Sequence, residues 1–333
     1  MEEIILLSHG SGGELTKRLI EEEILKYFGN EILGELLDSG VFNIEGKIAF
    51  TTDSFVVSPI FFNGGDIGKL SIYGTVNDLS VMGAKPLYLS VGFIIEEGLT
   101  LNEFRKILQS MSNACRECGV KIITGDTKVV EKGKGDKIFI NTTGIGIIEK
   151  DLDWRGRKIE EGDLIIINGG IGEHGISLML QRLGVKIGEE IKSDLAPLNS
   201  LTLPLLSFFK GIKFMRDPTR GGVAGVLNEV AQKYNVEIEI EEEKIPLKDW
   251  VRSASEILGI DPLYSANEGK VIIIGTREEG DKIVEFLNKH ELGKEGRIIG
   301  EIKGRGNKVY LKTKIGTRRI LDPLRKDLLP RIC

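Results

Sequence analysis

Short segments rich in β-branched residues alternate with helix-like segments along most of this 333-residue chain. Such alternation is typical of α/β folds, in which helices pack on the faces of a sheet. The clearest helix is expected at 101–118, because its apolar residues recur at the spacing of one core-facing stripe. In the first half of the chain we also expect a helix at 66–83 and strands at 48–52, 87–96, 120–124 and 137–149.

A charged segment at 151–162 is where we expect the chain to divide into two domains. The length supports this division, since single domains usually contain about 100–200 residues. We therefore predict an N-terminal domain at 1–155, a C-terminal α/β domain at 156–321 and a tail at 322–333. In the C-terminal domain the expected strands are 163–168, 236–241, 271–276, 297–303 and 308–312, and the expected helices are 175–183, 221–234, 248–258 and 278–288.

The composition argues against several classes of protein. Hydrophobic residues make up 41% and charged residues 29% of the chain, which is ordinary for a globular protein. The net charge of −5 predicts no nucleic-acid partner, because such partners usually require a clustered basic surface. No segment approaches the roughly 18 consecutive apolar residues of a membrane helix, so no membrane association is expected. The acidic N-terminus is unlike a signal peptide and the three cysteines are scattered, which together predict a cytoplasmic protein.

Three sequence patterns resemble known sites without completing them. The segment 170–175 fits G-x-G-x-x-G, but no second strand ends in an acidic residue at the distance that a dinucleotide-binding unit needs. The segment 64–69 is one residue too short for a Walker A loop and is followed by Leu70 instead of Ser or Thr. Cys115 and Cys118 lie on the apolar face of a predicted helix, so we expect buried thiols there.

Asp53, Asp78, Asp126 and Asp217 each stand at the end of an apolar segment. A single aspartate in this setting is usually a turn former or a helix cap. Several of them at the strand ends of one α/β protein can instead converge on a hard cation such as Mg²⁺, together with substrate phosphate oxygens. The segment 217–222 also precedes a predicted helix, whose first amides offer a site for an anion.

Both ends of the chain carry segments with two interpretations. Glycines at 10, 12 and 13 permit close approach to a phosphate, but they also suit a flexible N-terminal loop. At the other end, Pro323 and Pro330 prevent a continuous helix, so the tail is expected to be extended and mobile. Fully stretched it spans roughly 36 Å, against a radius of gyration of about 20 Å for a chain of this length. The thiol of Cys333 is therefore expected to reach both solvent and an internal site.

Taken together, these segments resemble the HypE family, the carbamoyl dehydratases of nickel–iron hydrogenase maturation, within the aminoimidazole ribonucleotide synthetase (PurM-like) superfamily. The likeness extends over essentially the whole chain, and the terminal sequence Pro330-Arg331-Ile332-Cys333 narrows the superfamily to HypE. It implies a two-domain PurM-like fold with an ATP site and a dimerising sheet in the N-terminal domain. The segments that carry the likeness are 9–13, 51–59, 74–86, 125–129, 169–175, 217–222, 267–269 and 330–333.

The resemblance also implies ligands and partners. Mg²⁺ would be held by the residues matching Asp53, Asp78 and Asp217. A HypF-type carbamoyltransferase would load Cys333, the protein would act as a homodimer, and a HypC–HypD-type complex would receive the cyano group. The residues expected at the ATP site are Gly10, Ser11, Gly12, Gly13, Asp53, Asn77, Asp78, Gly125, Asp126, Thr127, His174, Asp217, Thr219 and Arg220.

Converting a carbamoyl thioester into a thiocyanate requires loss of the oxygen and of two N–H protons. The oxygen leaves readily only after it accepts a phosphoryl group from ATP, and the two deprotonations need bases within hydrogen-bond reach. We expect Glu268 and Lys128 to be those bases, although Lys128 would serve equally well to neutralise phosphate. Two rival functions stay open, a small-molecule kinase or synthetase of the same superfamily and a non-catalytic thiol carrier that uses ATP as a switch.

Overall fold

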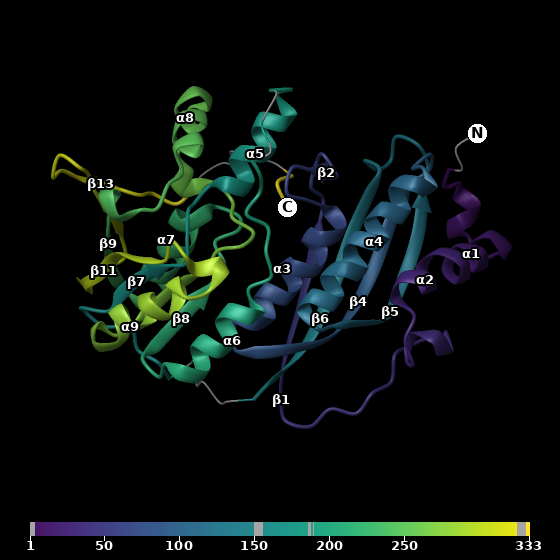
Figure 1. Cartoon of the computed structure of the whole chain (residues 1–333), viewed down its shortest axis with the longest axis horizontal. Coiled ribbons are helices and arrows are strands. Elements are labelled where there is room, and N and C mark those ends of the chain that lie inside the picture. Colours follow the sequence, from purple (N-terminus) through teal and green to yellow (C-terminus); the bar gives the residue numbers. More distant parts are fainter. Residues whose placement is uncertain (1–3, 150–155, 186–187, 189, 325–330) are drawn as a thin grey trace.

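The computed structural model describes residues 4–149, 156–185, 188, 190–324 and 331–333. Two sheets, each with its own helices, lie beside each other (Figure 1). The predicted boundary after residue 155 borders the stretch 150–155, which lies outside the described residues. The first described residue, Ile4, pairs with Thr100 of the N-terminal domain, and the C-terminus lies between the two sheets.

The N-terminal sheet has four strands in the order β1-β6-β4-β5. The first three pair antiparallel and the last two pair parallel. Helices α3 (Ile67–Val81) and α4 (Leu101–Cys118) cover one face of this sheet. The strands are β1 (Lys47–Phe55), β4 (Ala84–Glu96), β5 (Lys121–Val130) and β6 (Ile138–Ile148), and a two-stranded hairpin of β2 (Phe61–Phe62) and β3 (Gly65–Asp66) precedes α3.

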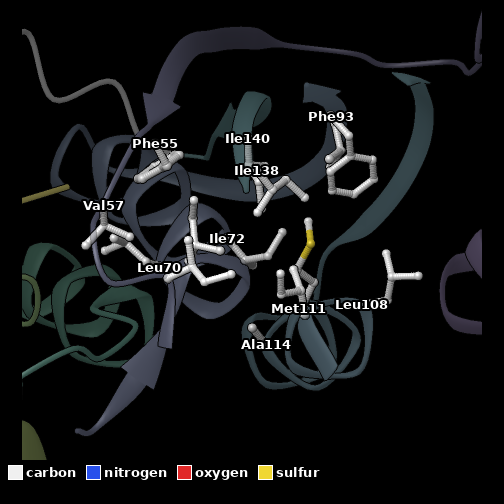
Figure 2. Packing of buried hydrophobic residues seen from close by; sticks show 14 of the residues in the cluster. Phe55, Val57, Leu70, Ile72, Phe93, Leu108, Met111, Ala114, Ile138 and Ile140 are labelled. Carbon is white, nitrogen blue, oxygen red and sulfur yellow. The ribbon is translucent and has the colours of Figure 1, made fainter. Parts of the chain in front are cut away.

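Local sequence explains where the two helices begin and end. The side chain of Asp66 accepts hydrogen bonds from the amides of Gly68 and Lys69, which caps the start of α3. Thr100 and Glu103 form a capping box at the start of α4, and Gly119 ends this helix with a φ of 72°. The predicted apolar stripe of α4 is confirmed, because its members are buried against the sheet (Figure 2).

The other face of the N-terminal sheet carries exposed apolar side chains. Ile48, Phe50 and Ile94 are 47%, 68% and 47% exposed. Short helical segments precede the sheet in the chain and lie beside its β5 edge. They are the turns Leu7–Gly10 and Leu33–Glu35, α1 (Glu14–Arg18), the π-helical segment Leu19–Ile24 and α2 (Leu25–Phe28).

The C-terminal sheet has seven strands in the order β13-β12-β9-β11-β7-β10-β8. Its interior strand β7 (Leu164–Ile167) is buried on both faces, with α7 on one side and α6 and α9 on the other. Both neighbours of β7 are antiparallel to it, so 170–175 does not belong to a parallel dinucleotide-binding unit. The remaining elements are β8 (Ile212–Arg216), β9 (Val236–Glu241), β10 (Ile272–Gly275), β11 (Arg297–Arg305), β12 (Val309–Lys312), β13 (Arg318–Ile320), α5 (Glu173–Arg182), α6 (Asn199–Phe208), α7 (Gly222–Tyr234), α8 (Asp249–Leu258) and α9 (Arg277–Asn288).

Direct contacts join the two domains. The side chain of Asn77 on α3 donates to the carbonyl of Ala196 at 3.1 Å and accepts from the amide of Leu198 at 2.7 Å. Val81, at the end of α3, packs in the same hydrophobic cluster as α6 and β10. These contacts fix the inner faces of the two domains against each other, and a cleft forms where they meet. None of the helices in the described ranges combines the length and apolar character needed to cross a membrane.

Candidate active site

A cleft of about 500 Å³ lies between the two domains, and the last residue of the chain forms part of its wall. Asp53 reaches it from β1, Asp78 from α3, Asp217 from the segment after β8 and Glu268 from the segment before β10. With Glu229 from α7, five acidic side chains thus line the same cleft as the thiol-bearing residue Cys333. The other lining residues are Ser54, Phe55, Val56, Gly74, Arg216, Thr219, Arg220, Val226, Arg331 and Ile332.

The strand and helix that carry the first two aspartates pack tightly. A Cβ added at Gly74 would lie 2.9 Å from the ring of Phe55, so α3 can approach β1 this closely only with glycine there. The hydroxyl of Thr51 donates to Oδ2 of Asp78 at 2.8 Å. This hydrogen bond ties the aspartate on the helix to the strand that carries Asp53, and it fixes their relative position.

Burial and mutual repulsion raise the pKa values of these carboxyl groups. Burial, and then the charge of Asp78, raise the pKa of Asp53 to about 6. The same two causes raise the pKa of Asp217 to about 7. For Glu268, burial and then the charge of Asp217 hold the pKa well above its ordinary value. Its Oε1 is buried and has no hydrogen-bond partner. Ionising these neighbouring carboxyl groups together costs free energy, and a bound cation would offset that cost. The set of oxygen donors therefore favours cation binding.

The carboxylates of the cleft suit Mg²⁺ better than they suit a metal ion whose ligands all come from protein side chains. Among the described residues, no three His, Cys, Asp or Glu side chains are grouped so as to hold a metal ion by themselves. Mg²⁺ usually takes only one or two carboxylates and completes its shell with water and substrate phosphates. Burial raises the pKa of both Asp53 and Asp78, and the charges of Arg220 and Arg216 respectively offset part of that rise. The cleft therefore offers both carboxylates for a cation and guanidinium groups for an anion.

Without metal or nucleotide, Asp217→Asn is expected to increase the free energy of unfolding at pH 8 by about 2 kcal/mol. The carboxyl of Asp217 has a folded pKa of about 7 against an ordinary 3.8, so the folded chain binds this proton more tightly than the unfolded chain. Stability therefore falls as the pH rises from about 4 to 7, and the full penalty applies above pH 7. Asparagine is never charged and avoids it. Urea unfolding at pH 4 and pH 8 measures the difference.

A suitable control for this measurement is Asp126→Asn. The pKa of Asp126 is lowered by its hydrogen bond with Lys128, so its removal gives no gain at pH 8. Equal stability of Asp217→Asn and the unaltered chain at pH 8 would show that Asp217 is not repelled by its neighbours.

The last three residues pair with the chain just after β1. The amide of Val56 donates to a main-chain carboxylate oxygen of Cys333 at 3.1 Å, and the amide of Ser58 donates to the carbonyl of Arg331 at 3.3 Å. The side chain of Ile332 is buried in the N-terminal core. The end of the chain thus lies inside the cleft, while the rest of the predicted mobile tail at 325–330 lies outside the described residues.

Several residues predicted at the ATP site line a second cavity of about 470 Å³ at the β5 edge of the sheet. There Lys128 is exposed and pairs with Asp126 at 2.7 Å. Two more strands, β6 and β4, separate β5 from β1, which places this edge about 14 Å from Asp53. Within one chain Lys128 and Glu268 therefore do not share a cavity. The predicted ATP-site residues in this second cavity are Gly10, Gly12, Gly125, Asp126 and Thr127.

Close packing explains two of the glycines in this second cavity. A Cβ at Gly10 would lie 2.4 Å from the amide nitrogen of Val129, and one at Gly125 would lie 2.5 Å from the carbonyl of Val91. Both glycines are needed for packing against β5 or β4, whatever the cavity binds. The remaining loop residues, Ser11 and Gly13, line neither cavity, although the hydroxyl of Ser11 donates to the carbonyl of Ser8.

The predicted ligand residues Asn77 and His174 are buried and line neither cavity. Asn77 joins the domains, as described above, and His174 contacts the end of the chain. A further buried group behind Glu268 has no recognisable pattern in the sequence. Asp194 accepts hydrogen bonds from the amides of Glu268 and Gly269 and pairs with Lys270 at 3.2 Å. This arrangement fixes the backbone that carries Glu268.

Comparison with known proteins gives closely related sequences and structures. The family models "AIR synthase related protein, N-terminal domain" and "AIR synthase related protein, C-terminal domain" match residues 37–148 and 160–312. Carbamoyl dehydratase HypE of Cupriavidus necator is 43% identical over 330 residues, which cover 98% of this chain and 94% of that protein. These matches confirm the predicted two-domain PurM-like fold.

Two solved structures bear on ligands and partners. A hydrogenase maturation protein HypE in complex with ATP matches with a TM-score of 0.95 and 44% identity, covering 98% of this chain and 99% of that one. The HypE–HypF complex matches with a TM-score of 0.79 and 47% identity, covering 92% of this chain and 99% of that one.

Proposed function

The chain belongs to the HypE family of carbamoyl dehydratases, and we propose that it dehydrates a carbamoyl group carried on its own Cys333 at the expense of ATP. The observation that carries this proposal is the position of Cys333 in a cleft lined by five acidic side chains. A kinase for a free small molecule needs that space for its substrate, whereas here the chain's own C-terminus fills part of it. A HypF-type protein would supply the carbamoyl group, since a relative is known in complex with HypF.

The reaction takes S–CO–NH2 to S–C≡N with loss of one oxygen and two protons. Asp53, Asp78 and Asp217 would hold Mg²⁺ together with phosphate oxygens of ATP, and the ion would supply charge neutralisation. ATP would supply the phosphoryl group that makes the oxygen a good leaving group. Arg216 and Arg220 line the same cleft and provide positive charge for phosphate oxygens. Pairing of the tail with Val56 and Ser58 brings Cys333 to these groups.

Glu268 is the base that we assign to one amide proton. Its buried Oε1 has no partner and is free to accept a proton, and its raised pKa makes the ionised carboxylate a stronger base. Lys128 stays a candidate for one of two roles, removing the second amide proton or neutralising the charge of phosphate. Since it lies at the far edge of the sheet, it would reach the cleft only from a second copy of the chain.

A homodimer joined through the N-terminal sheets fits the exposed apolar face described above. Ile48, Phe50 and Ile94 lie on this face and would be buried by a second copy. A monomeric mass by light scattering at micromolar concentration would contradict this part of the proposal. The cytoplasmic location stays a prediction, which the absence of a disulfide bond among the three described cysteines suits. Transfer of the cyano group to a HypC–HypD-type complex also stays a prediction.

The function is tested by the mass of the C-terminal peptide after carbamoylation, measured before and after addition of Mg²⁺ and ATP. We expect the loss of one water, about 18 Da, only when ATP is present. A thiol carrier that uses ATP as a switch would keep its mass. An unchanged mass, with an active carbamoyl donor and bound ATP, would therefore contradict the dehydratase. ATP turnover that does not depend on carbamoylated Cys333 would then favour a small-molecule kinase over the thiol carrier.

A further inference from the structure

Helix α5 contacts the end of the chain through residues at both of its ends. His174 lies in its first turn and Arg182 is its last residue. Nε2 of His174 lies 2.8 Å from the carbonyl oxygen of Ile332, and Nη2 of Arg182 donates to the carbonyl oxygen of Arg331. Nε of Arg182 also donates to the carbonyl of Ser58 at 2.6 Å, on the segment with which the tail pairs. One helix thus holds two consecutive carbonyl groups next to Cys333.

The hydrogen bonds around His174 fix its tautomer. The carbonyl of Ile332 can only accept, so Nε2 must carry the hydrogen. On the other side of the ring, Nδ1 lies 2.7 Å from Oγ of Ser193, and that oxygen already accepts from the amide of Leu195 at 3.0 Å. The hydroxyl hydrogen of Ser193 is therefore directed to Nδ1. Burial lowers the pKa of His174, so a neutral ring with one donor and one acceptor is consistent with its position.

The tail adds contacts from its own side chain. Arg331 donates from Nε to the carbonyl of Val56 at 2.9 Å and pairs with Asp136 at 2.7 Å. It does so with a φ of 54°, a left-handed conformation that is unfavourable for a residue with a side chain. An unfavourable backbone that persists requires surrounding contacts that determine it. The contacts of the tail with α5 and with Val56 are the ones that hold Arg331 in this conformation.

We propose that His174 and Arg182 are positioning residues that hold the carbonyl groups of Ile332 and Arg331 so that Cys333 stays in the cleft. This inference rests on the proposed function, because it assigns the tail as the substrate of the site. The contacts engage main-chain carbonyls, so they suit the free thiol, the carbamoylated thiol and the thiocyanate alike. The same contacts give the glycine-rich segment 170–175 a structural role. Gly172 has a φ of 80° and leads directly into the helical turn that carries His174.

The test is the rate at which a water-soluble maleimide alkylates Cys333 in the intact protein. Cys115 and Cys118 are buried and do not compete. If the tail undocks and docks faster than it is alkylated, the alkylation rate is proportional to the fraction of chains with the tail undocked. The rate then rises even while most tails stay docked. Loss of one such hydrogen bond is expected to increase the rate by about fivefold. We expect this increase in His174→Leu and in Arg182→Ala.

Three further variants make the result specific. Glutamine at position 174 can still donate to Ile332 and accept from Ser193, so His174→Gln should keep a rate close to that of the unaltered chain. Arg116→Ala removes an exposed arginine from α4 and is the matched control for Arg182→Ala, with no change expected. Arg331→Ala alters only the tail, so it stays informative if the buried His174→Leu fails to fold, and its rate should also rise.

The alkylation assay needs neither ATP nor a carbamoyl donor, so its outcome does not depend on the proposed reaction. Unchanged alkylation in folded Arg182→Ala and Arg331→Ala would overturn the inference while leaving the dehydratase intact. For the pre-carbamoylated chain, we expect Arg182→Ala and His174→Leu to lower the single-turnover rate of water loss without changing the ATP concentration that gives half the maximal rate. Restoration of that rate in His174→Gln separates positioning from a general loss of structure.

Discussion

A chain in which Cys333 is replaced by serine is expected to form no detectable dehydrated product. The main-chain contacts that hold the tail do not depend on the sulfur, so Cys333→Ser should dock as before. What changes is the chemistry at the terminal atom. A thiol ionises at a pKa near 8.5 and is intrinsically nucleophilic, whereas a serine hydroxyl is weak without an adjacent base. The carbamoyl group should therefore fail to load, and no later step can follow.

The measurement is the mass of the C-terminal peptide after incubation with the carbamoyl donor, Mg²⁺ and ATP. Cys115→Ser serves as the matched control, because this thiol is buried on α4, where burial raises its pKa to about 12. It should lose some stability and keep full product formation. If the control failed and Cys333→Ser succeeded, the modified sulfur would have to lie on another residue, and the proposed role of the tail would be wrong.

Most of the secondary structure could be predicted because its apolar residues follow a clear period. The stripe on 101–118 predicted α4 with the observed bounds, and the β-branched run at 236–241 did the same for β9. Helix α6 was missed because Asn199–Phe208 is apolar on most sides and contains Pro204, which hides the helical period. Strand β5 was predicted too short, since Gly125 and Asp126 are poor strand formers that pair with β4 here.

Part of the candidate site was predictable from the type and setting of its residues. Aspartates expected at strand ends suggested a cluster, and Asp53, Asp78 and Asp217 do line one cleft. Only Asp217 directly follows a strand, because Asp53 lies within β1 and Asp78 within α3. The sequence does not say which edge of the sheet a strand occupies, so it could not show that Asp126 and Lys128 lie in another cavity.

The contacts of the tail had no signature in the sequence at all. Arg182 and His174 bind main-chain carbonyls, and any residue offers such a carbonyl. Only the packing of α5 beside the end of the chain reveals them. This is why the tail could be recognised as reactive from its terminal cysteine, while the side chains that hold it could not.

Glu268→Gln is expected to slow the loss of water from carbamoylated Cys333 by about 10²–10⁴-fold, the usual cost of removing a general base. Glutamine has nearly the same shape and leaves the backbone hydrogen bonds of Asp194 to residues 268 and 269 in place. It cannot take a proton from the amide, and its amide group would place a donor or acceptor where Oε1 now has no partner. ATP binding should be retained, because the three aspartates of the cleft and the guanidinium groups of Arg216 and Arg220 are unchanged.

Single-turnover kinetics with the pre-carbamoylated chain would measure this effect, with ATP affinity measured separately by calorimetry. Glu229→Gln is the matched control, since Glu229 lines the same cleft but is exposed and paired with Arg216. It should retain most of the rate. Water loss at the normal rate in Glu268→Gln would remove this residue from the proton transfers. The base would then have to come from the other cavity, where Lys128 of a second copy becomes the first candidate.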